Sequence, residues 1–128
     1  MQLNNILLID DDDATCLILK AILSRSNIAK TFNFCLGGAE ALEFLLQCEN
    51  NNEFPEVVFV DLNMPGMDGY EFIPLYEEEF YSRHPKTRIV VVTSSMRMKD
   101  KEQALAFKSV SHFINKPLTK EKILSVNE

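Results

Sequence analysis

The sequence lacks tryptophan, has only four glycines and two histidines, and contains no long hydrophobic run. No apolar stretch approaches the roughly 18 residues that a membrane-spanning helix needs. Residues 6–9 are aliphatic and are followed by four aspartates, a pattern unlike that of a secretory signal peptide. These absences argue against a membrane-inserted or secreted protein, and we expect a cytoplasmic one.

Cysteine is also scarce, and its arrangement is uninformative about metals. Cys16, Cys35 and Cys48 are odd in number and are too far apart to form a metal-binding motif. We therefore predict reduced, buried thiols. His84 and His112 are far apart in the sequence as well, and we assign neither a catalytic role.

The length of 128 residues is sufficient for one domain with one core. We expect a single domain over residues 1–128 without an output domain; the chain could be a stand-alone protein or a fragment of a larger one.

The net charge of −6 argues against nucleic acid as a direct partner. Residues 1–79 carry a net −12 and residues 80–128 a net +6, which reflects either chance plus an acidic site, or a basic face for a protein partner.

Short aliphatic runs that end in acidic, hydroxyl or amine residues are the most informative feature. Such runs are typical of strands in a parallel sheet that is buried on both faces. In open α/β sheets, ligands bind just beyond the carboxyl ends of the strands. Four runs end in this way: residues 6–9 at Asp10 and Asp11, 57–60 at Asp61, 89–92 at Thr93, and 112–115 at Lys116.

The remaining segments complete five β-α units. Residues 32–36 alternate between apolar and polar, as in an edge strand. Helices are predicted after each strand: one from residue 14, one after Gly37-Gly38 in which residues 41, 42, 45 and 46 share a face, then over about 70–82 and 99–108, and from about residue 119. The expected fold is an α/β, flavodoxin-like, doubly wound five-stranded parallel sheet of order 2-1-3-4-5, with helices on both faces.

Four segments, which follow one another along the chain, resemble the receiver domain of response regulators, the phosphoacceptor module of two-component signalling. Residues 6–12 resemble the acidic pocket of that family, and residues 61–69, reading DLNMPGMDG, resemble its phosphorylation loop. Thr93-Ser94 matches the switch hydroxyl and its small neighbour, and Lys116-Pro117 matches the lysine-proline pair. The chain departs from the family at Ser109-Val110, where relatives often have Gly-Ala.

The resemblance implies a role for each acidic residue. Asp61 would be the phosphoacceptor, and Asp10 and Asp11 would bind Mg²⁺ or Mn²⁺. Asp11 would bind directly and Asp10 through water, with Asp61 and the backbone carbonyl of Asn63 completing the protein ligands. Lys116 would neutralise charge on the phosphoryl group, and phosphoryl transfer needs mainly positioning and charge stabilisation.

The resemblance also implies a switch beside the acids. Thr93 and the backbone N–H of Ser94 would hydrogen-bond the phosphoryl group, and Phe113 would be the switch aromatic, although a core phenylalanine explains it equally well. The Lys116–Pro117 bond is predicted to be cis, which is rare among folded X–Pro bonds.

By this resemblance, the chain is a signalling module that takes a phosphoryl group from a histidine kinase or a histidine phosphotransfer protein. It would catalyse only its own phosphorylation and dephosphorylation, and would switch the surface that contacts an unknown downstream protein. The alternative is a haloacid-dehalogenase-like phosphatase, because Asp11-x-Asp13-x-Thr15 after a strand matches the DxDxT motif of that family. That family generally has a longer chain and a late pair of acids near the site, whereas Asp100 is the only aspartate after Asp68, which argues against this alternative.

The first helix has two apolar stripes. We predict that Asp12 and Asp13 cap this helix. One stripe would form the core face, and comprises Ala14, Leu17, Ile18, Ala21 and Ile22. The opposite stripe contains Cys16, Leu19 and Leu23. Either neighbouring elements cover this second stripe, or Leu19 and Leu23 stay exposed and dock a kinase or phosphotransfer protein.

Overall fold

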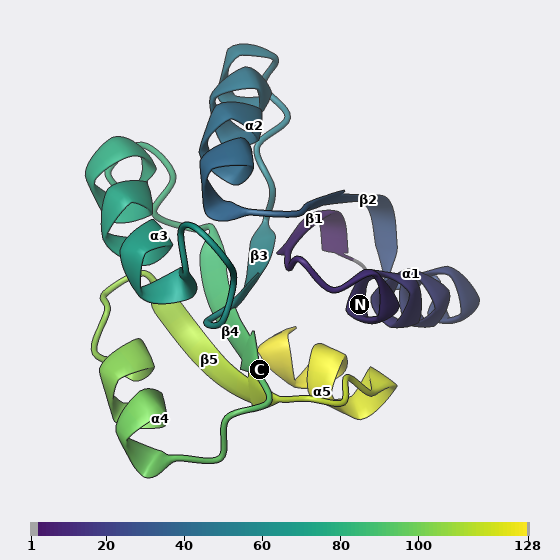
Figure 1. The fold of residues 1–128 in the computed structure, drawn as a ribbon. Coiled ribbons are helices and arrows are strands. Elements are labelled where there is room, and N and C mark those ends of the chain that lie inside the picture. The colour runs from purple at the N-terminus through teal and green to yellow at the C-terminus, as the bar shows by residue number, and fades with distance from the viewer. Residues whose placement is uncertain (1–2, 128) are drawn as a thin grey trace.

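A five-stranded parallel sheet forms the centre of the computed structural model, which describes residues 3–127 (Figure 1). The strand order β2-β1-β3-β4-β5 and the parallel pairing confirm the predicted topology. The strands are β1 Leu3–Ile9, β2 Ala29–Cys35, β3 Val57–Asp61, β4 Arg88–Thr93 and β5 Val110–Asn115.

Helices cover both faces of this sheet, as predicted. In Figure 1, α1 and α5 lie on one face, and α2, α3 and α4 lie on the other. They comprise α1 Asp13–Ser26, α2 Gly38–Asn50, α3 Gly69–Tyr76, α4 Met98–Leu105 and α5 Lys120–Leu124, with a π-helix η1 Glu77–Tyr81 after α3 and a 3₁₀ turn η2 Ser125–Asn127 after α5.

The central strand β3 shows how the sequence pattern produces two cores. All five of its residues are buried, because helices cover both sides. Successive side chains point to opposite faces of a sheet. Val58 and Val60 accordingly pack in the cluster under α2, α3 and α4, and Val57 and Phe59 pack in the cluster under α1 and α5.

Side-chain caps start three of the helices: Asp12 caps α1, Asp68 caps α3 and Thr119 caps α5. Asp12 is the N-cap of α1 and accepts a hydrogen bond from the N–H of Ala14, which confirms its predicted role. Asp68 and Glu71 form a reciprocal capping box at α3. These caps fix where α1 and α3 begin, immediately after the loops that follow β1 and β3.

The predicted orientation of the first helix is wrong. Leu19 and Leu23, which in one of the two alternatives stay exposed to dock a partner, are buried in the core under α1 and α5, with exposed fractions of 0% and 3%. Leu17 and Ile18, expected to be buried, are 67% and 44% exposed. Both stripes are apolar, so periodicity alone could not choose between them. The orientation follows from tertiary packing, because Leu19 and Leu23 lie in one core cluster with residues of β1, β3 and α5.

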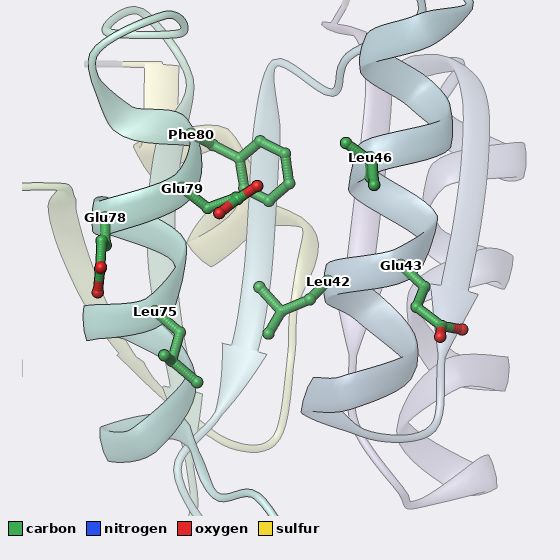
Figure 2. A pocket seen from close by; sticks show the side chains of 7 residues that line it. All are labelled: Leu42, Glu43, Leu46, Leu75, Glu78, Glu79 and Phe80. Carbon is green, nitrogen blue, oxygen red and sulfur yellow. The ribbon is translucent and has the colours of Figure 1, made fainter.

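A hollow lies between α2 and the segment formed by α3 and η1. Figure 2 shows Leu42 of α2 and Phe80 of η1 pointing into the space between the two helices. The hollow has a volume of about 350 Å³ and contains none of the predicted site residues. Its lining residues are Leu42, Glu43, Leu46, Leu75, Glu78, Glu79 and Phe80. Within residues 3–127, no helix is long and apolar enough to cross a membrane.

Candidate functional site

Three carboxylates meet where β1 and β3 end. Ile9 of β1 pairs with Val60 of β3, so the next residues, Asp10 and Asp61, emerge side by side. One carboxylate oxygen from each of Asp10, Asp11 and Asp61 lies within 4.8 Å of the other two. Asp10 and Asp61 are buried and Asp11 is exposed, so the cluster has an inner part and an outer part.

Lys116 supplies the positive charge to this cluster. Its backbone N–H donates to the carbonyl of Thr93 at 2.9 Å, which continues the pairing of β5 with β4. The Lys116–Pro117 bond is cis, as predicted. The Nζ of Lys116 lies 2.8 Å from Oδ2 of Asp10 and 3.4 Å from Oδ2 of Asp61. One ammonium therefore contacts both buried carboxylates.

The loop after β3 orients Asp61. The N–H of Asn63 donates to Oδ1 of Asp61 at 3.2 Å, which leaves Oδ2 facing Lys116. At the far end of the loop, the N–H of Gly69 donates to the carbonyl of Leu62 at 3.1 Å. A side chain at Gly69 would lie 2.7 Å from the carbonyl oxygen of Asp61, so glycine is required for this close approach.

The environment of Asp61 disfavours its charged form. Burial raises the pKa of Asp61 and the charge of Asp10 adds to this effect, while the N–H of Asn63 and the ammonium of Lys116 oppose it. Burial by itself would lower the pKa of Lys116, but its contacts with Asp10 and Asp61 outweigh burial and raise that pKa. The pocket thus has an excess of negative charge that a further cation would relieve.

The carboxylates fit a hard divalent cation such as Mg²⁺, which takes oxygen ligands and keeps several waters. Both oxygens of Asp10 are already engaged, because Oδ1 accepts from the N–H of Asp12 at 2.9 Å and Oδ2 pairs with Lys116. Asp11 is exposed, which leaves its carboxylate accessible from solvent. Asp11 therefore suits direct ligation, and Asp10 suits ligation through a water molecule. The oxygens of Asp61 make only longer contacts, at 3.2 Å with the N–H of Asn63 and at 3.4 Å with Lys116, and are the more available of the two buried pairs.

The predicted switch residues lie on the neighbouring strands. Val92 of β4 pairs with Asp61, so the buried Thr93 follows one residue further along. The N–H of Ser95 donates to Oγ1 of Thr93 at 3.1 Å. Ser94 is exposed, and Phe113 is partly buried against the cluster under α2, α3 and α4. Thr93 and Ser94 thus lie at the same edge of the sheet as the carboxylates.

Sequence reasoning missed a second acidic centre beside this edge. The buried Asp100 of α4 accepts hydrogen bonds from Tyr70, Ser95 and Arg97. Tyr70 precedes Asp100 by 30 residues, so no local pattern indicated the contact. The available signal in the sequence was one aspartate, Asp100, near the start of a helix that is otherwise mostly basic and polar.

The phosphatase alternative finds no support in this geometry. Its motif would direct both Asp11 and Asp13 into one catalytic site, but Asp13 is exposed as the first residue of α1. The hydroxyl of Thr15 donates to Asp12, the helix cap, at 3.2 Å. Residues 11–15 therefore build a helix start, and only Asp11 joins the carboxylate cluster.

Known proteins share this sequence pattern. Residues 6–127 match the model of the response regulator receiver domain family. The chain is 29% identical over 121 residues to the sensor histidine kinase CheAY of Helicobacter pylori, an alignment that covers 94% of this chain and 14% of that kinase. The chain spans less than half the length of several of the curated relatives that it matches.

Solved structures agree with this assignment. A two-component response regulator from Cytophaga hutchinsonii superposes with a TM-score of 0.92 and 26% identity over the full length of both chains. The CheY of a CheX–CheY–BeF₃–Mg²⁺ complex from Borrelia burgdorferi reaches a TM-score of 0.76 at 25% identity, covering 94% of this chain and 84% of that one. By sequence, topology and site, the chain belongs to the response regulator receiver domain family, whose members are phosphoacceptor signalling modules.

Proposed function

We propose that Asp61 of this receiver domain accepts a phosphoryl group from a phosphohistidine of a histidine kinase or a phosphotransfer protein. The observation that carries the proposal is the pairing of the buried Asp61 carboxylate with Lys116, beside the carboxylates of Asp10 and Asp11. Such a site combines a nucleophile with preorganised charge, which is what phosphoryl transfer requires.

In the proposed reaction, a carboxylate oxygen of Asp61 attacks the phosphorus atom of the donor. A P–O bond forms, and the P–N bond to the donor histidine breaks, leaving an aspartyl phosphate and a neutral imidazole after protonation. Lys116 stabilises negative charge on the transferring oxygens. Asn63, whose N–H is bonded to Oδ1, holds the carboxylate in one orientation during the attack.

We infer that Mg²⁺ or Mn²⁺ binds at the outer side of the same cluster. Asp11 and Asp61 would ligate it directly, Asp10 through water, and the carbonyl of Asn63 would complete the protein ligands. When bound, the cation neutralises charge on the carboxylates and on the phosphoryl oxygens. The Mg²⁺ and BeF₃ named for the complex of the similar Borrelia CheY support this assignment.

After transfer, Thr93 and the N–H of Ser94 would donate hydrogen bonds to the phosphoryl oxygens. Phe113 would respond as the neighbouring aromatic of the switch, and the altered surface would bind a downstream protein. The chain would act as a signalling module, catalysing only its own phosphorylation and dephosphorylation. Its similarity to a sensor histidine kinase sequence supports a role within such a relay.

Acetyl phosphate, a small phosphodonor, tests the proposed chemistry directly. With Mg²⁺ or Mn²⁺ present, intact-mass spectrometry should detect the addition of one phosphoryl group, and chelation with EDTA should prevent it. Asp61→Asn should abolish labelling. Asp12→Asn serves as the matched control, because Asp12 caps α1 and should remain dispensable. Stable labelling of the Asp61→Asn protein at another residue would overturn the assignment.

A further inference from the structure

Asp100, the third residue of α4, joins separate parts of the chain through a carboxylate that is only 5% exposed. Its Oδ1 accepts a hydrogen bond from the hydroxyl of Tyr70 in α3 at 2.5 Å. Its Oδ2 accepts from the hydroxyl of Ser95 at 2.5 Å and from Nε of Arg97 at 3.1 Å. Asp100 therefore connects α3 and the β4–α4 loop to the start of α4.

Ser95, in the β4–α4 loop, is bonded at each of its three polar groups. Its hydroxyl donates to Asp100, and its carbonyl accepts from Nδ2 of Asn115 at 2.5 Å. Its N–H donates to Oγ1 of Thr93 at 3.1 Å. The bond to Asp100 thus holds the residue whose N–H contacts the Thr93 hydroxyl.

The hydrogen bonds from Asp100 through Ser95 to Thr93 have a chemical consequence for the Thr93 hydroxyl. A hydroxyl oxygen that accepts a hydrogen bond becomes a better donor through its own proton. The bond from Ser95 also favours one position of Oγ1 among the staggered rotamers open to a threonine. A donor that is already held in place does not have to be ordered when the phosphoryl group arrives.

We propose that Asp100 is a positioning residue for phosphoryl binding, acting through Ser95 on the hydroxyl of Thr93. The inference rests on the proposed function of Asp61 and extends it to a residue outside the carboxylate cluster. An acid in the first turn of a helix also stabilises that helix through its dipole. That role alone needs neither the bond to Ser95 nor the bond from Ser95 to Thr93.

The series of hydrogen bonds from Asp100 through Ser95 to Thr93 predicts which substitutions weaken binding of a phosphoryl analogue. Asp100→Asn and Ser95→Ala should each weaken the affinity of the Mg²⁺-saturated protein for beryllofluoride, a phosphoryl analogue, by about fivefold, the usual effect of one hydrogen bond. The double variant should bind beryllofluoride no more weakly than the weaker-binding of the two single variants, because both changes interrupt the same series of hydrogen bonds. Tyr70→Phe is the matched control: it removes a bond to Asp100 but leaves Ser95 attached, and should stay within about twofold of the unmodified protein.

The measurement follows ¹⁹F and amide NMR signals during beryllofluoride titration, with Mg²⁺ affinity measured separately and expected to be unchanged. The proposal would be overturned if folded Asp100→Asn bound beryllofluoride with the affinity of the unmodified protein, or if Tyr70→Phe lost as much affinity as Asp100→Asn. If Asp100→Asn does not fold, the affinity of Ser95→Ala for beryllofluoride decides in the same way. Failure of the unmodified protein to bind beryllofluoride would instead refute the proposed function itself.

Discussion

The ammonium of Lys116 lies 3.4 Å from Oδ2 of Asp61, although 55 positions separate the two residues in the sequence. Among residues 3–127, no second basic side chain forms an ion pair with Asp61. Lys116 also contacts Asp10, so it balances two buried charges at once. Without a divalent cation, the stability of this end of the sheet therefore depends on one lysine.

Lys116→Met should lower the free energy of unfolding by about 3 kcal/mol in EDTA, because it leaves two buried carboxylates without a positively charged partner. Added Mg²⁺ should recover part of this loss. Urea denaturation followed by circular dichroism measures both effects. The matched control is Lys120→Met, at an exposed lysine that should change stability by less than about 0.5 kcal/mol. Equal stability of the two variants in EDTA would contradict the prediction.

The network at Asp100 predicts a pH dependence in acid. Hydrogen bonds from Ser95, Tyr70 and Arg97 lower the pKa of Asp100 from 3.8 to about 2. The folded state thus favours the charged carboxylate, and this contribution to stability is complete above about pH 4 and lost as the pH falls toward 2. The difference in unfolding free energy between the unmodified protein and Asp100→Asn should shrink over that range. A difference that is constant from pH 6 to pH 2 would contradict it.

The orientation of α1 can be tested with two leucines. Leu19 is fully buried and Leu17 is 67% exposed. Leu19→Ala should destabilise the protein by about 2–5 kcal/mol through lost burial and a cavity, whereas Leu17→Ala should stay within about 0.5 kcal/mol. Thermal or urea unfolding of both variants measures the contrast. The reverse order of stabilities would restore the orientation expected from the sequence.

The sequence predicted most of the sheet because its signals there are unambiguous. The aliphatic runs at residues 57–60 and 89–92 can be buried only as central strands, and they became β3 and β4. In α1, by contrast, apolar residues occur on two sides, so the pattern did not determine which side faces the sheet. The choice was made by tertiary packing against β1 and α5, which a local pattern does not contain.

The same distinction applies to the site. Asp10, Asp61, Thr93 and Lys116 were predictable because each ends a strand or directly follows one, and parallel strands bring their ends to one edge. Asp100 was not predictable, because its partners come from α3 and a loop whose path depends on the complete fold. Contacts that follow from topology can be anticipated from sequence, while contacts made by helix side chains across loops cannot.

The three cysteines should react slowly in the native state. Burial raises the pKa of Cys16 to about 11 and that of Cys35 to about 12, and it also raises the pKa of Cys48. At pH 8, roughly one thousandth of Cys16 would be thiolate, the reactive form. Labelling with a chromogenic disulfide reagent should be slow until urea exposes the thiols. Ser24→Cys, at an exposed position of α1, should add one rapidly labelled thiol; fast labelling of the unmodified protein would contradict the prediction.

Gly69 offers a test of how closely the backbone fixes Asp61. A Cβ at this position would lie 2.7 Å from the carbonyl oxygen of Asp61 and 2.9 Å from Cα of Leu62, and both of these atoms belong to the backbone. Gly69→Ala must therefore move the end of β3 or the start of α3. At Gly38, a Cβ would lie 2.7 Å from Sδ and 2.9 Å from Cγ of Met67, but both atoms belong to a flexible side chain and not to the backbone.

We expect Gly69→Ala to lower the free energy of unfolding by about 1–3 kcal/mol, and Gly38→Ala to lower it by less than about 1 kcal/mol. The functional contrast should be larger, because a small displacement of a nucleophile can reduce a rate by orders of magnitude. Labelling by acetyl phosphate should slow at least tenfold in Gly69→Ala and remain near the unmodified rate in Gly38→Ala, both at saturating Mg²⁺. Rates are compared under conditions where each variant is fully folded, so that lost stability does not imitate a lost rate. If Gly69→Ala is labelled as fast as Gly38→Ala, the contact between Gly69 and the backbone of Asp61 does not control the position of the phosphoacceptor.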